Sequence, residues 1–396
     1  MHPLHDIDDP AAPKPQPFAL WALGFRPFYL GASAFAAASV ALWTLQFSGA
    51  IQGSYLTGPV WHAHEMLFGF ALAVIVGFLF TAGRNWTNRP TPTGNALAAL
   101  VLLWLTARVL VLTPFGWLAA AANVAFPIAA AIALAKPFIA ARSRRNYFFI
   151  ALLAAMGAAS GLVHLSQLGL IAAPAWAGLQ LGLDVVLFIV AVMAGRVVPM
   201  FTNNAIHGAG AARNARLEKV ALGALLAVLA ADLVGLKGIA LATLAALAAI
   251  AHGARWLLWR PWTTLRTPLV WVLHVAYAWV PIHLALRALA ELGVVAPSMA
   301  THALTVGAIG GIIIGMITRT ARGHTARPLR ADRFDVTCYG LVLLAALSRV
   351  ALPLALPGLT LVAIQLSALF WCAGFGLYAV RYWPVLTRAR LDGQPG

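Results

Sequence analysis

Residues 61–83 read WHAHEMLFGFALAVIVGFLFTAG, in which a short polar start leads into a long apolar run. A helix needs about 20 mostly apolar residues to cross the hydrocarbon core of a membrane, and this stretch has that length. The rest of the chain has the same character, because 62% of its 396 residues are hydrophobic and 10% are charged. A soluble domain carries about 25% charged residues. The sequence therefore predicts an all-α integral membrane protein and excludes a soluble globular one.

Twelve apolar runs of this kind are predicted to form transmembrane helices. They cover residues 25–47, 61–83, 95–113, 116–136, 146–168, 174–198, 216–235, 238–256, 268–291, 298–318, 334–352 and 358–382. We expect residues 1–20 to be a polar tail, residues 21–385 a single transmembrane domain, and residues 386–396 a C-terminal tail. The first 18 residues lack the basic and then apolar order of a signal peptide, so the first apolar run is expected to be a retained helix.

The basic residues predict the orientation of these helices. Most of the 27 Lys and Arg residues fall in loops that a twelve-span topology places on one side, and such loops face the cytoplasm. Both termini are then cytoplasmic. The formal net charge of +16 would suggest nucleic-acid binding in a soluble protein, but here it sets the topology, and no nucleic-acid partner is expected. Cys338 and Cys372 lie in apolar runs, and the sequence has no CxxC pair or CxxCH haem-attachment motif.

Five of the 11 histidines are predicted to share one depth near the outer face of the membrane. They are His62, His64, His164, His283 and His302. Ionisable groups in a membrane span are costly and are therefore candidates for function, and imidazole is the commonest metal ligand and a frequent axial ligand of haem. These five histidines are our candidate metal ligands. The alternative is that they pair with other polar groups and only stabilise helix packing.

The segment around His62 and His64 leaves two arrangements open. Residues two apart on a regular helix point about 200° apart, so the two imidazoles would serve different sites. If the chain is still non-helical after residues 58–59, they could instead chelate one ion. Glu65 is a candidate catalytic residue, as a proton carrier, as a ligand, or as a group that orients an imidazole.

Two methionines accompany these histidines. Met66 follows His62 by four positions and Met299 precedes His302 by three. A thioether beside an imidazole suits copper, although methionine is common in any apolar helix. We retain both as candidate cofactor-binding residues.

The remaining intramembrane charges have pairing as their simplest explanation. Asp184 is predicted to pair with Arg108, and Arg287 with Glu291 four residues later. Arg287 also follows His283 by four positions, so it is a candidate contact for a haem propionate. Asp232 and Arg349 lie near helix ends, where a side chain can reach the interface.

Three helix exits are similar in composition and recur every fourth helix. Residues 81–90, 195–204 and 318–328 all contain Arg, Thr and Pro after an apolar run, and each holds Gly or Asn as well. The spacing suggests three arcs of four helices. The alternative is convergence, because such residues are common at any helix end.

The sequence resembles the NnrS family over nearly its whole length. The motifs that carry the resemblance are GFRPF at 24–28, WHAHEM at 61–66 with Gly69, the exit at 81–90, GRVVPMFT at 195–202, HAL at 302–304 and GHT at 323–325. The resemblance implies a twelve-span protein of the bacterial inner membrane that contains haem b and copper, or another second metal such as non-haem iron. It also implies a link to denitrification and to tolerance of nitric oxide and nitrosative stress.

Three classes of function are compatible with these features. An oxidoreductase similar to nitric oxide reductase would couple two nitric oxide molecules to nitrous oxide, with electrons from quinol or a redox protein. A sensor or scavenger would bind nitric oxide without turnover. A membrane transporter or metal-handling protein would place its site near the midplane, whereas these histidines are predicted to lie in the outer third.

The predicted topology can be tested with fusion reporters. Reporters at Arg144 and Arg213 should report the cytoplasm, because basic loops remain on that side. Reporters within residues 50–58 and 292–298 should report the opposite side. A cytoplasmic location for residues 50–58 would contradict the twelve-span topology.

Overall fold

The computed structural model describes residues 18–51 and 55–394, and among these residues helices connected by short loops are the regular secondary structure, with no strand. Most of the predicted N-terminal tail and part of the loop at 50–58 lie outside the described residues. The successive helical segments are α1 (Phe25–Phe47), α2 (Gly58–His64) with η1 (Glu65–Ala71) and α3 (Leu72–Thr87), α4 (Gly94–Leu110), α5 (Gly116–Ala140), α6 (Phe148–Gln167), α7 (Ala175–Ala205), α8 (Ala215–Leu233), α9 (Gly238–Leu258), α10 (Pro268–Glu291), α11 (Pro297–His302) with η4 (Ala303–Gly310) and α12 (Gly311–His324), α13 (Arg333–Ala355) and α14 (Thr360–Thr387). Short 3₁₀ turns at Arg144–Asn146, Pro261–Thr264 and Pro357–Leu359 lie between them.

These segments match the twelve predicted runs and confirm an all-α polytopic membrane protein. Within the described part of the chain, ten helices are long and apolar enough to span a membrane, and Gly94–Leu110 is a shorter apolar helix. Two helices extend beyond their predicted ends. We expected α7 to end before Pro199 and α14 before Pro384, but both prolines lie inside the helix. Membrane helices tolerate an internal proline because neighbouring groups satisfy the freed carbonyl.

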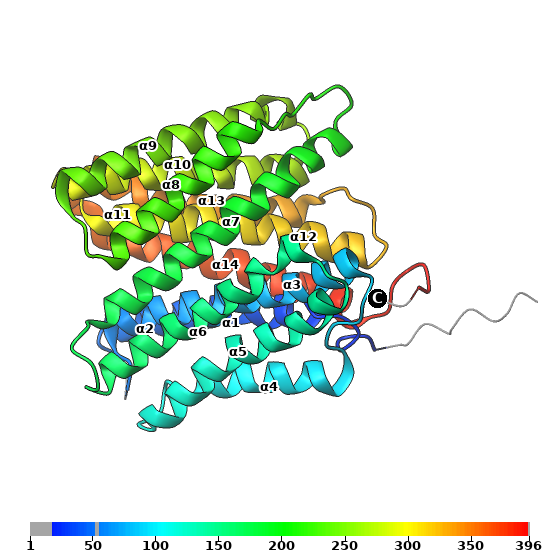
Figure 1. Ribbon diagram of the computed structural model, residues 1–396, viewed down its shortest axis with the longest axis horizontal. Helices are drawn as coiled ribbons and strands as arrows, with labels where there is room; N and C mark the ends of the chain where they lie inside the picture. The colour runs from blue at the N-terminus through cyan, green and yellow to red at the C-terminus, as the bar shows by residue number, and fades with distance from the viewer. Residues whose placement is uncertain (1–17, 52–54, 395–396) are drawn as a thin grey trace, which may run out of the picture.

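Four of the segments are the most buried and form the centre of the bundle. In Gly58–Thr87 and Ala175–Ala205, 89% and 78% of the most apolar 18 residues are buried, and in Pro268–Glu291 and Pro297–His324 the share is 67% each. Segment η1 packs against α7, and α7 packs against η4. Helices α8 and α9 lie at one side of the bundle and α4 at the other, while α1 and α14 run side by side (Figure 1). Three of these four segments are those with the similar exits, and the fourth is α10.

Two of the central segments change helix type directly after a histidine. The π-helix η1 begins at Glu65, after His64, and the π-helix η4 begins at Ala303, after His302. A π-helix is closed by i→i+5 hydrogen bonds, so its turns are wider than those of an α-helix, and it is rare and frequently found at functional sites. The labels α2 and α11 lie at the same end of the bundle (Figure 1), so both transitions occur at that end.

Glycines allow other helices to approach the two π-helices closely. A Cβ on Gly69 would lie 2.6 Å from the Phe35 ring, and one on Gly307 would lie 2.5 Å from the Trp279 ring. Trp104 donates its indole N–H to the carbonyl oxygen of Gly69 over 2.9 Å. Aromatic rings from other helices therefore fill the space that a side chain would occupy at Gly69 and Gly307. The Trp104 indole also satisfies a backbone carbonyl of η1.

The close contact at Gly307 predicts a selective loss of stability. Gly307→Ala should destabilise the protein by about 1–3 kcal/mol, because the added methyl group overpacks a filled core. The matched control is Gly340→Ala on α13, where a Cβ would meet nothing within 4 Å. The measurement is the apparent melting temperature of each detergent-purified variant. An equal change in both variants would contradict the packing assigned to η4.

Candidate functional site

Two of the predicted metal ligands meet between α2 and α6. The ring centroids of His64 and His164 lie 4.9 Å apart with an interplanar angle of 79°. Both side chains are fully buried. Helix α2 is regular and begins at Gly58, so His62 and His64 point to different sides of it and do not chelate one ion together.

The hydrogen bonds of this pair leave one nitrogen of each ring without a partner. Nδ1 of His64 lies 2.7 Å from Oε1 of Glu65. A carboxylate only accepts, so Nδ1 of His64 carries the proton and Nε2 presents a lone pair. Nδ1 of His164 lies 3.1 Å from the Tyr55 hydroxyl. Both Nε2 atoms are buried without a hydrogen-bond partner, a costly state unless another group satisfies them.

Tyr55 is a site residue that the sequence analysis missed. Its ring stacks on that of His164 at a centroid distance of 5.7 Å. Burial raises the pKa of Tyr55 to about 12, so the phenol keeps its proton at neutral pH. Tyr55 is then a fixed hydroxyl partner that orients the His164 imidazole. Its position in a loop gave no periodic signal by which it could be found.

A series of buried, hydrogen-bonded polar groups orients His64 through Glu65. Glu65 accepts a hydrogen bond from Nη1 of Arg108 at 2.5 Å, and Nη2 of Arg108 donates to the side-chain oxygen of Asn123. Asn123 in turn donates to the carbonyl oxygen of Ala119 over 2.8 Å. The predicted pairing of Arg108 with Asp184 is therefore wrong. Charges buried in an apolar medium are tolerated when each is paired and hydrogen-bonded, and Glu65 meets this need for Arg108.

His62 and His302 belong to a second region of the same end. The His62 ring stacks on Trp43 of α1 at 5.0 Å and 19°, and its Nδ1 is buried without a hydrogen-bond partner. Nδ1 of His302 lies 2.7 Å from the carbonyl oxygen of Ser298. Arg349 interacts electrostatically with both histidines, and the two histidines with each other.

His283 lies close to the helix that carries His302. Its Nδ1 is 2.8 Å from the carbonyl oxygen of Ala300. This bond fixes the ring and leaves Nε2 as the second nitrogen, as in many metal-bound histidines. Of the two candidate methionines, Met299 is buried and Met66 is half-buried.

Arg287 is occupied by two carboxylates from other helices. It forms ion pairs with Asp184, at 3.7 Å, and with Asp232. The predicted pairing with Glu291 is wrong, because Glu291 instead accepts the backbone N–H of Gly238 over 3.0 Å. Sequence spacing favoured the neighbour on the same helix, whereas the fold brings α7 and α8 closer to this guanidinium.

The described residues contain no group of three or more His, Cys, Asp and Glu side chains that could hold one metal ion. The predicted histidine layer is thus divided into smaller sets. The His64–His164 pair fits a metal best, because both Nε2 atoms are buried without a partner and both Nδ1 atoms have an oxygen partner. This is the usual arrangement of metal-bound imidazoles, whose second nitrogen is oriented by an oxygen.

A second buried polar cluster lies between α8, α9 and α10. Arg255 forms two hydrogen bonds of 2.8 Å with Glu218 and a third of 2.9 Å with the Tyr277 hydroxyl. His252 bridges Tyr277, at 2.6 Å, and the carbonyl oxygen of Ala221, at 3.0 Å. The His252 side chain is fully buried. Both of its nitrogens have partners, so this cluster is structural.

The Glu65–Arg108 ion pair predicts a double-mutant rescue. Arg108→Met should destabilise the protein by about 3–5 kcal/mol, because it leaves a carboxylate buried and unpaired. Glu65→Gln in the same chain should restore part of that loss. Arg89→Met, at an exposed position, is the control. The measurement is the apparent melting temperature, and a double variant no more stable than Arg108→Met would rule out the pairing.

The comparison with known proteins places the chain in one family. No curated protein matches it. The family model described as NnrS protein matches residues 19–390, a range that includes every histidine and polar partner of the site described above. The protein is a member of the NnrS family.

Proposed function

We propose that this protein is a haem- and metal-containing protein of the bacterial inner membrane that acts on nitric oxide in denitrification or nitrosative-stress defence. Membership of the NnrS family links it to nitric oxide. The observation that carries the proposal is the His64–His164 pair, whose buried Nε2 atoms both lack a hydrogen-bond partner. The basic residues at the helix exits support cytoplasmic termini.

The chain offers two sets of residues for two bound groups, haem b and copper or another second metal such as non-haem iron. His64 and His164 would hold one group, and His62 and His302 the other, on the opposite side of α2. When bound and reduced, such metals bind diatomic ligands and stabilise the charge that develops on them. His283 and Arg287 remain candidates for further contacts, although Arg287 is already paired with two carboxylates.

Glu65 is placed to hold or move a proton beside this pair. Its Oε1 accepts from both His64 and Arg108, while its Oε2 is buried without a hydrogen-bond partner. The conversion of two nitric oxide molecules to nitrous oxide and water consumes two electrons and two protons. Glu65 would supply protons, and quinol or a redox protein would supply electrons. Arg108 holds the carboxylate in place and offsets its charge.

Metal content tests the assignment of the two sets. His64→Ala and His164→Ala should lose the same metal, because both imidazoles face one site. His62→Ala should lose a different one. His207→Ala, in an exposed loop, should match wild type. The measurement is iron, copper and the haem absorbance band of each purified variant. Retention of every metal in His64→Ala and His164→Ala would contradict the assignment.

The rate of nitrous oxide formation shows whether Glu65 delivers protons or binds a metal. Glu65→Gln keeps an oxygen that accepts from His64 and Arg108, so it should retain the metals. It should lower nitrous oxide formation about 100-fold or more, because it cannot carry the proton. The assay supplies nitric oxide and a reduced quinol to the purified protein. Nitric oxide binding without nitrous oxide formation in wild type would instead assign a sensor or scavenger.

A further inference from the structure

A basic cavity lies at the end of the bundle opposite to the candidate ligands His62, His64 and His302. Its volume is about 230 Å³, far more than the ~10–15 Å³ that one water molecule needs. It is formed where α12 ends, α13 begins and α14 approaches the C-terminus. The lining residues are Arg322, Arg327, Asp332, Arg381, Tyr382, Pro384, Val385 and Arg388. We call it the arginine cavity.

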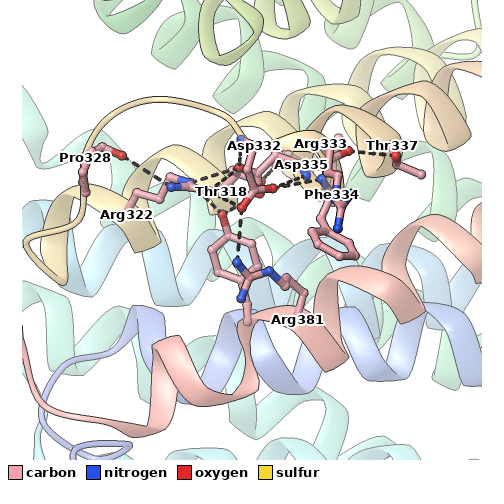
Figure 2. A network of polar contacts seen from close by, with 11 residues as sticks. Thr318, Arg322, Pro328, Asp332, Arg333, Phe334, Asp335, Thr337 and Arg381 are labelled. Carbon is pink, nitrogen blue, oxygen red and sulfur yellow. Dashed lines mark hydrogen bonds and ion pairs between the residues drawn. The ribbon is translucent and has the colours of Figure 1, made fainter.

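Two of its four arginines are neutralised by carboxylates. Arg322 donates to Asp332 at 2.9 Å and to Asp335 at 2.6 Å, and Arg381 donates to Asp332 at 3.2 Å. Figure 2 shows Arg322 and Arg381 reaching Asp332 from two directions. The Tyr382 hydroxyl also donates to Asp335, over 2.8 Å. Both carboxylates, Asp332 and Asp335, are therefore already paired with Arg322 or Arg381.

The other two arginines have no such partner. In the part of the chain that the structure describes, neither Arg327 nor Arg388 forms an ion pair, and Nη1 of Arg327 is buried without a hydrogen-bond partner. Burial, and then the nearby charge of Arg322, lower the pKa of Arg327, with smaller contributions from Arg381 and Arg388. Burying a cation beside other cations is costly unless an anion compensates it.

We propose that the arginine cavity binds a phosphate group. Four guanidinium groups lie near two carboxylates here, so a bound phosphate group would offset the remaining positive charge. Guanidinium forks match phosphate oxygens in pairs, and several forks from different directions suit a tetrahedral anion. The cavity lies among the basic helix exits, beyond the apolar part of α12, α13 and α14, where lipid headgroups are expected. The phosphate could belong to an anionic lipid or be a free anion, and both sources share this chemistry. The proposal is independent of the metal site.

Two measurements on the full-length protein distinguish these sources. Protein purified in phosphate-free buffer is first stripped of lipid, and the binding of inorganic phosphate is measured by equilibrium dialysis against sulfate at the same ionic strength. Separately, protein in nanodiscs of phosphatidylcholine with phosphatidylglycerol is released into native mass spectrometry, which counts retained phosphatidylglycerol. Saturable phosphate binding identifies a free anion, and retained phosphatidylglycerol identifies a lipid.

Variants tie either signal to the cavity. Arg327→Gln should weaken the signal ~10-fold or more, since a hydrogen bond to a charged group is lost. Arg388→Gln, at an exposed position, should weaken it as well. Arg330→Gln, an exposed arginine of the same loop that does not line the cavity, should leave it unchanged. The proposal is overturned if wild type gives neither signal, or if Arg327→Gln and Arg388→Gln behave like Arg330→Gln.

Discussion

The buried ion pair between Glu65 and Arg108 is the constraint on which the histidine site depends. In an apolar medium neither charge is stable alone, so α4 must place its guanidinium at the start of η1. Once it is there, Glu65 is held against Nδ1 of His64. The imidazole then has one orientation and one protonation state, with Nε2 buried without a hydrogen-bond partner. A single electrostatic requirement thereby fixes the ring that we assign to a metal.

The π-helix after His64 serves the same purpose. Gly69 lies within η1, and its missing side chain leaves room for Phe35 and Arg108. A larger residue there would displace the guanidinium from Glu65. The π-helix after His302 repeats this arrangement on another central segment, with Gly307 against Trp279. Both helix irregularities therefore lie beside candidate ligands, where a change in helix geometry redirects the side chains that precede it.

The helices could be predicted from the sequence, whereas the contacts between them could not. Hydrophobic runs and basic loops depend on local composition, and they gave twelve helices whose count and order agree with the structure. The partner of Arg108 depends on which helix lies opposite, 43 positions away in the chain, and no local pattern encodes this. For the same reason Arg287 pairs with Asp184 and Asp232 rather than with its neighbour Glu291. Tyr55 lies in a loop, where side-chain periodicity is absent, and the arginine cavity combines the ends of α12 and α14, which lie far apart in the chain.

The central claim is that His64 and His164 bind one metal through Nε2. X-ray absorption at the iron and copper edges of the purified protein tests it most directly, because outer-shell scattering counts imidazole ligands. The account predicts that one metal shows two imidazoles in wild type and one fewer in His164→Ala. An unchanged imidazole count at both edges in His164→Ala would contradict it.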